Sequence, residues 1–155
     1  MRIEAWPKHG PLNSKTIFKK FIESMQKGGD EVIVDKETNA DVAVIWSVLW
    51  RGRMQSYKSV WERYRKQGKP VIVIEVGGLR RNLSFKIGIN GINRDADFAN
   101  DKFDDKRWPL FKHDLRPWNP TGDLVVICGQ QDASEQWRGL PKMSQWIEQQ
   151  IIEIR

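Results

Sequence analysis

Cysteine, histidine and long apolar runs are scarce in this 155-residue sequence, and each scarcity excludes a class of protein. The one cysteine, Cys128, cannot form an internal disulfide, which excludes small secreted disulfide scaffolds and fits a reducing compartment. With only two histidines beside that thiol, a structural zinc site is not expected. No apolar run approaches the roughly 18 to 20 residues of a spanning helix, and Met1 leads into a charged, strand-like segment rather than a signal peptide. We therefore expect a cytoplasmic protein with no membrane span and no metal.

Positive charge and tryptophan, by contrast, are abundant. The 26 lysines and arginines exceed the 20 aspartates and glutamates, which gives a formal net charge of +6 and a pI near 9.5. That balance favours an anionic partner such as nucleic acid, a nucleotide or a phosphorylated sugar. Eight tryptophans supply flat apolar surface for the core, for ligand stacking or for both. At this length, two full domains are not expected.

Hydrophobic periodicity predicts alternating strands and helices along most of the chain. Three runs, 41–46, 71–76 and 123–128, are apolar on both alternating faces, which is typical of central strands in a parallel sheet that is covered by helices. Further strands are predicted at 2–6, 31–35 and 84–89, and amphipathic helices at about 15–27, 54–67 and from 141 onward. This order predicts a Rossmann-like α/β fold, an open, mostly parallel sheet with helices on both faces, because parallel neighbours need helical crossovers. A flavodoxin-like domain is the nearest alternative, and residues 79–120 show little periodicity.

The loops that follow the predicted strands define a candidate site, because ligands of open α/β sheets bind beyond the carboxyl ends of the strands. The polar residues predicted to contact a ligand there are Arg51, Arg53, Arg80, Arg81, Asn90, Gln130 and Arg138, and Lys8 lies in the first of these loops. Arginine forks match phosphate and carboxylate oxygens, so the set favours an anionic ligand, although each arginine alone could be a solvated loop charge. Trp46 and Trp50 are candidates for stacking on a sugar or base, or for packing the sheet under its helices.

Three residues are candidates for catalysis. Glu75 lies near the carboxyl end of an otherwise apolar strand, which suits either a general base or a structural ion pair with an arginine. His9 follows the first strand and could act as acid, base or phosphate donor, or be ordinary polar surface. Cys128 ends a buried strand in this interpretation. At such a position a cysteine more commonly packs as a small apolar side chain than acts as a catalytic thiol. No stretch matches a phosphate loop or a GxGxxG fingerprint, so no cofactor is predicted.

Four stretches of the sequence carry a resemblance to a known group of proteins. They are residues 40–47 (ADVAVIWS), 68–78 (GKPVIVIEVGG), 88–94 (GINGINR) and 126–131 (VICGQQ), the last followed by Trp137, Arg138 and Gly139. Together they resemble the amino-terminal half of bacterial and phage proteins described as GT-B-type glycosyltransferases, which are related to capsule polysaccharide enzymes. A GT-B enzyme has two Rossmann-like domains with the active site between them. The resemblance implies that residues 1–118 are the acceptor-side domain, while 119–155 are a final strand and helix that either join the same sheet or begin a truncated second domain.

The expected function is therefore that of a glycosyltransferase-related α/β domain whose carboxyl edge binds a nucleotide sugar or another phosphate-bearing ligand. Glu75 or His9 would deprotonate an acceptor hydroxyl. The chain by itself is expected to transfer no sugar, because in the two-domain plan that it resembles the second wall of the cleft is absent here. One alternative is a non-catalytic module for nucleic acid or nucleotides. Another is a half-domain that is completed by a partner chain or by a second copy.

Overall fold

The computed structural model describes residues 1–79, 83–97, 106, 108–112, 116–117, 121–122, 124–134 and 137–154. These residues belong to two compact units, unit 1 (Met1–Arg107) and unit 2 (Trp108–Arg155). No helix in these ranges has both the length and the apolar character that a bilayer crossing requires.

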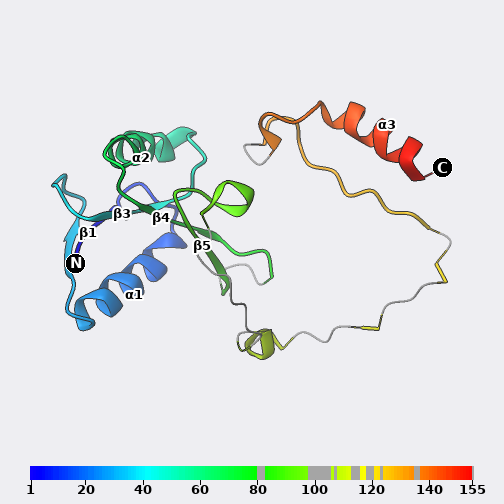
Figure 1. Ribbon diagram of the computed structural model, residues 1–155. Coiled ribbons are helices and arrows are strands. Elements are labelled where there is room, and N and C mark those ends of the chain that lie inside the picture. The colour runs from blue at the N-terminus through cyan, green and yellow to red at the C-terminus, as the bar shows by residue number, and fades with distance from the viewer. Residues whose placement is uncertain are drawn as a thin grey trace. The chain divides into compact units, whose positions relative to one another are not determined.

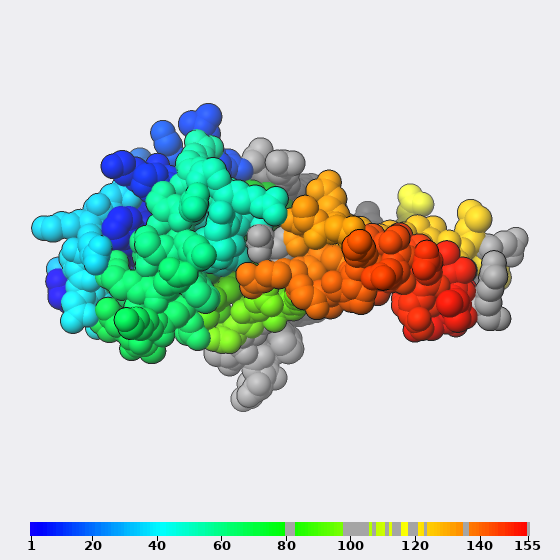
Figure 2. Space-filling model, turned by 90° about the horizontal axis from the view of Figure 1, so that it is seen from above, coloured from blue at the N-terminus to red at the C-terminus, as the bar shows by residue number. Residues whose placement is uncertain are grey.

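Unit 1 is a five-stranded sheet with a helix on each face (Figure 1). Its strands lie in the order β2-β1-β3-β4-β5, in which the first four are parallel and β5 is antiparallel to β4. Helices α1 and α2 cover opposite faces, and Figure 2 looks down onto the α2 face, whose atoms are coloured cyan to green. This arrangement confirms the predicted Rossmann-like, mostly parallel α/β sheet. The elements are β1 (Arg2–Ala5), α1 (Ser14–Lys27), β2 (Glu31–Val34), β3 (Val42–Trp46), α2 (Ser56–Lys66), β4 (Val71–Val76) and β5 (Phe85–Ile89).

The core lies on both faces of β3, at the centre of the sheet. Every residue of β3 is buried, as its continuous apolar run predicts for a strand that is covered on both sides. In β4, Val71, Val73 and Ile74 are buried in the same core. The helices contribute Phe18 from α1 and Tyr57, Val60 and Tyr64 from α2, which lie on the apolar stripes of the two sequences.

Residues 124–128 of the strand predicted at 123–128 form no strand. Asp123 lies outside the described residues, and residues 124–130 belong to no strand. Leu124, Val125 and Val126 are 88%, 66% and 77% exposed. An apolar run becomes a strand only when neighbouring strands accept its backbone hydrogen bonds, and in the described part of the chain none lies alongside this one. Cys128, predicted to be buried in that strand, is exposed for the same reason.

Unit 2 nevertheless contains the predicted last helix, α3 (Met143–Ile154). The backbone N–H of Met143 donates a hydrogen bond to the Asp132 carboxylate, which satisfies one of the amides at the helix start. The Trp137 and Trp146 rings pack edge to face with centroids 5.5 Å apart. Gly129 lies against Met143, because a Cβ at this glycine would come within 2.8 Å of the Met143 sulfur. The described residues of unit 2 therefore form a local loop-and-helix structure and belong to no sheet.

Candidate ligand-binding site at the carboxyl edge of the sheet

Two of the predicted loops meet at one edge of the unit 1 sheet. Strands β1 and β3 are parallel neighbours, so the loop with His9 and the loop with Arg51 and Arg53 leave the sheet at the same edge. The β3 loop continues into a short 3-10 helix, Gly52–Gln55, which leads directly into α2. Arg80 and Arg81, which follow β4 in the sequence, lie outside the described residues.

Tyr57, in the first turn of α2, is the residue on which these loops converge. The His9 ring meets its ring edge to face, with centroids 6.0 Å apart. Burial raises the pKa of the Tyr57 hydroxyl, the nearby Asp35 carboxylate raises it further, and the His9 backbone amide and the Arg53 guanidinium oppose them. The buried hydroxyl makes no hydrogen bond of good geometry, although the His9 amide is close enough to influence its pKa. A buried hydroxyl without a partner is costly, so its presence here needs an explanation.

A pocket of about 380 Å³ opens beside this tyrosine. Its volume is at the small end of the range for small-molecule sites. Aromatic, hydroxyl and charged groups from the β1 loop, the segment between β2 and β3, and α2 all contribute to its wall. We call it the Tyr57 pocket; it is lined by Trp6, His9, Glu37, Ser56, Tyr57, Ser59, Val60 and Arg63.

A buried ion pair holds the wall of the Tyr57 pocket in place. Glu4 of β1 is fully buried, and its carboxylate accepts a 2.7 Å hydrogen bond from Nη2 of Arg63 on α2. Thr38 donates to the same carboxylate through its backbone N–H and its hydroxyl, and the Trp6 indole N–H donates at 3.3 Å. Arg63 also donates to the Thr38 carbonyl and pairs with Glu37 at 3.4 Å. The network ties β1, the loop before β3 and α2 together.

Sequence reasoning missed Glu4. Its sequence signal is a single carboxylate between the apolar Ile3 and Ala5, and a glutamate side chain is usually exposed unless it is paired. The partner that makes burial tolerable, Arg63, is 59 residues away. Only the packing of α2 onto the sheet brings the two together.

The Glu4 pair predicts a specific acid sensitivity. Burial raises the pKa of Glu4, but hydrogen bonds from Arg63 and Thr38 outweigh burial, so the net pKa in the folded state is lowered from its ordinary value of 4.5. A carboxylate with a lowered folded pKa contributes stability above its unfolded pKa and loses it as the pH falls through the folded value. We therefore expect the urea midpoint to fall as the pH drops from about 5 to 3. The fall should be smaller in Glu4→Gln, and equal pH profiles of the two proteins would contradict this assignment.

Glu75 reaches the same edge of the sheet but not the Tyr57 pocket. It is half-buried near the end of β4, where its Oε1 accepts a 2.8 Å hydrogen bond from the Val76 N–H, and its cross-strand neighbour is Lys86. Strand β3 separates β4 from β1, so the two backbones are about 10 Å apart. The two predicted catalytic residues, Glu75 and His9, are therefore not positioned to act on one proton.

The side chains of three other predicted contact residues pack on, or hydrogen-bond to, other parts of the protein. Trp46 is 2% exposed and packs edge to face on Phe85, so it offers no open face to a ligand. Trp50 packs on Trp61, with ring centroids 5.9 Å apart. Asn90 follows the antiparallel β5 and so lies at the amino edge of the parallel strands, where its Oδ1 accepts a hydrogen bond from the first N–H of β4. The structure thus separates Asn90 from His9 and Arg53.

The remaining predicted contacts, Gln130 and Arg138, belong to unit 2 and are exposed. The Gln130 side chain accepts a hydrogen bond from the Gln131 N–H. In the described parts of both units, no group of three or more histidine, cysteine, aspartate or glutamate residues is arranged to hold a metal ion.

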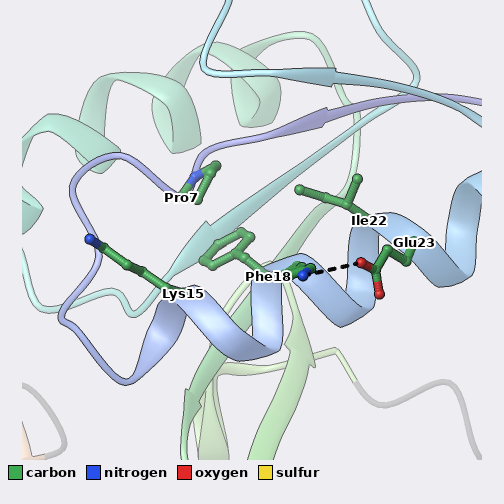
Figure 3. Close-up of a pocket in the computed structure, with 6 residues that line it drawn as sticks. Pro7, Lys15, Phe18, Ile22 and Glu23 are labelled. Carbon is green, nitrogen blue, oxygen red and sulfur yellow. Dashed lines mark ion pairs between the residues drawn. The ribbon is translucent and has the colours of Figure 1, made fainter.

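A second pocket, of about 340 Å³, lies along α1 (Figure 3). Pro7, Phe18 and Ile22 form its apolar wall, and Lys15 stands at its rim. The exposed Lys19 and Glu23 side chains, 3.8 Å apart, form an ion pair at the other end. Unlike the Tyr57 pocket, it contains no buried polar group that lacks a partner.

Comparison of the chain with protein-family models, with curated proteins and with solved structures finds no match. The resemblance to GT-B-type glycosyltransferases therefore stays a prediction.

Proposed function

We propose that unit 1 is a glycosyltransferase-related α/β domain that binds a phosphate-bearing ligand, such as a nucleotide sugar, at the carboxyl edge of its sheet. The observation that carries the proposal is the convergence of His9 and Arg53, from two different strand loops, on the start of α2. Open α/β sheets bind their ligands at this edge.

The two loops provide complementary chemistry for a phosphate group. Arg51 and Arg53 present guanidinium groups on exposed residues of the β3 loop, and such forks can bind phosphate oxygens in pairs. His9 is half-buried beside Tyr57, within a loop held by a 3.0 Å hydrogen bond from the Lys8 N–H to the Asp35 carboxylate. An imidazole in a fixed loop is suited to accept a proton from a ligand hydroxyl. We assign this role to His9 ahead of Glu75, because β3 separates the strand that carries Glu75 from the β1 loop, and Glu75 does not line the Tyr57 pocket.

A thermal-shift series tests the proposal. UDP-glucose and inorganic phosphate are titrated against the full chain and against Arg53→Gln, with Lys66→Gln at the far end of α2 as a charge-matched control. At 100 times its dissociation constant, a ligand adds about 2.7 kcal/mol of stability. We expect the shift with UDP-glucose to shrink in Arg53→Gln and to persist in Lys66→Gln. Equal shifts in both variants, or no shift in the parent chain, would refute binding at this edge.

Nucleic acid is the competing ligand for a basic surface. Backbone phosphate contacts release counterions, so affinity for an oligonucleotide falls steeply with salt, whereas a sugar nucleotide held in a pocket is less sensitive. Repeating the titration with a 20-mer oligothymidylate at 50 and 200 mM salt separates the two functions.

A specific observation favours the second alternative, a half-domain that a partner completes. Leu124, Val125 and Val126 are exposed in unit 2, and so are Ile152 and Ile154 of α3. Apolar side chains on both a strand-like segment and its following helix are typical of elements that are buried inside a larger sheet. A partner chain or a second copy that supplies strands to unit 2 would bury them, and the predicted division near residue 118 stays a prediction.

A further inference from the structure

The Tyr57 pocket differs in charge from the arginine-bearing loop next to it. Each of the three guanidinium nitrogens of Arg63 already meets a protein oxygen, from Glu4, the Thr38 carbonyl or Glu37. Two carboxylates thus surround the one guanidinium in the pocket wall, in a protein whose overall charge is +6. A phosphate placed here would meet no unpaired cation on Arg63 and would face the Glu37 carboxylate.

The hydrogen-bonding groups of the pocket suit uncharged hydroxyls. The Tyr57 O–H lacks a hydrogen-bond partner and can donate one. The hydroxyls of Ser56 and Ser59 donate to the backbone carbonyls of Arg53 and Ser56, so their own lone pairs remain available as acceptors. Together with the Glu37 carboxylate, the pocket combines one buried donor with several acceptors, which matches groups that both donate and accept.

Trp6 adds an apolar wall of fixed orientation. Its indole N–H is held by the Glu4 carboxylate, and its backbone N–H donates a 2.9 Å hydrogen bond to Val44 of β3. Because the polar end of the indole faces the buried carboxylate, the rest of the ring is the part that can line the pocket. Val60 extends this apolar wall. An apolar wall beside hydroxyl partners is suited to a ring that carries C–H groups and hydroxyls together.

We propose that the Tyr57 pocket is a subsite for an uncharged polyhydroxylated ring, separate from the contacts that hold phosphate. The inference rests on the proposed function, because it assigns the neutral part of the same ligand to this pocket and the anionic part to the arginine-bearing loop. The Tyr57 hydroxyl, which belongs to the pocket lining and has no partner in the protein, is a binding group in this assignment. The pocket has room for one ring of monosaccharide size.

The experiment compares two tyrosines that share one property. Tyr57 and Tyr64 both carry buried hydroxyls without a partner, but only Tyr57 lines the pocket. Methyl α-D-glucopyranoside and myo-inositol serve as neutral probes and inorganic phosphate as the anionic probe, each titrated by NMR into the full chain, Tyr57→Phe and Tyr64→Phe. We expect Tyr57→Phe to weaken the neutral probes about three- to tenfold, the effect of one hydrogen bond, and to leave phosphate unchanged. Tyr64→Phe should change neither, and neither variant should lower the melting temperature.

Three other results would overturn the proposal, and a fourth would overturn only the proposed function. If the neutral probes shift no resonance of Trp6, His9 or Tyr57, the subsite does not exist, even when phosphate still binds in an Arg53-dependent manner. If phosphate shifts these resonances and the neutral probes do not, the pocket is itself the anion site. If Tyr57→Phe and Tyr64→Phe weaken the neutral probes equally, the effect is structural. Loss of phosphate binding alone, with neutral binding intact, would refute the proposed function and leave this pocket standing.

Discussion

Replacing Arg63 by leucine is expected to lower the free energy of unfolding by about 3 to 5 kcal/mol, because Glu4 would remain fully buried without its cation. Removing one partner of a buried pair costs more than the pair contributes, since the remaining charge loses both water and its counterion. Equilibrium urea unfolding at pH 7, followed by circular dichroism, measures the change. A loss below about 1 kcal/mol would mean that the Thr38 donors and solvent suffice to hold the carboxylate.

Two further variants make this result specific. Lys19→Gln breaks the exposed pair with Glu23 one turn away on α1, and it should change the stability by less than about 0.5 kcal/mol. The double variant Glu4→Leu with Arg63→Leu should recover much of the loss, because an apolar pair replaces an ionic one in the same space. If the double variant were as unstable as Arg63→Leu alone, the cost would come from lost packing of the arginine stem rather than from the unpaired carboxylate.

The backbone amides of residues 124–130 are expected to exchange with solvent at least about 1,000-fold faster than those of β3 in a dilute sample of the chain. The β3 amides belong to a central strand in which every residue is buried, so their exchange requires global unfolding or a large opening. Residues 124–130 take part in no strand pairing, and three of their apolar side chains face solvent. Hydrogen exchange read by mass spectrometry or NMR measures both segments in one sample.

The same hydrogen-exchange measurement is repeated at several concentrations of the chain. If a second copy supplies strands to unit 2, protection of residues 124–130 should rise between micromolar and millimolar chain, and Val126→Lys should abolish the rise. Because Val126 is 77% exposed, the same substitution should leave protection of β3 unchanged. Strong protection at every concentration would show instead that the segment pairs with a strand of its own chain. Protection that stays low at all concentrations would exclude the second copy as the partner.

Local patterns in the sequence were sufficient to predict most of unit 1. Apolar runs in β3 and β4 and apolar stripes in α1 and α2 predict which residues are buried. The order of these elements predicts parallel strands joined by helices. The same order places His9, Arg51 and Arg53 at the carboxyl edge, because every parallel strand ends there. These predictions depend only on local patterns in the sequence and on the order of the elements.

Tertiary structure decided what each residue meets. A pattern predicts that a residue is buried but does not identify its partner. Trp46 packs on Phe85 and Trp50 on Trp61 instead of facing a ligand, and Glu4 pairs with Arg63 of α2. Strand direction is also non-local: because β5 runs antiparallel, Asn90 lies at the opposite edge from His9. The run at 124–128 has the composition of a central strand, yet a strand exists only between neighbours that share its hydrogen bonds. Composition determines what can be buried, and long-range pairing determines what is.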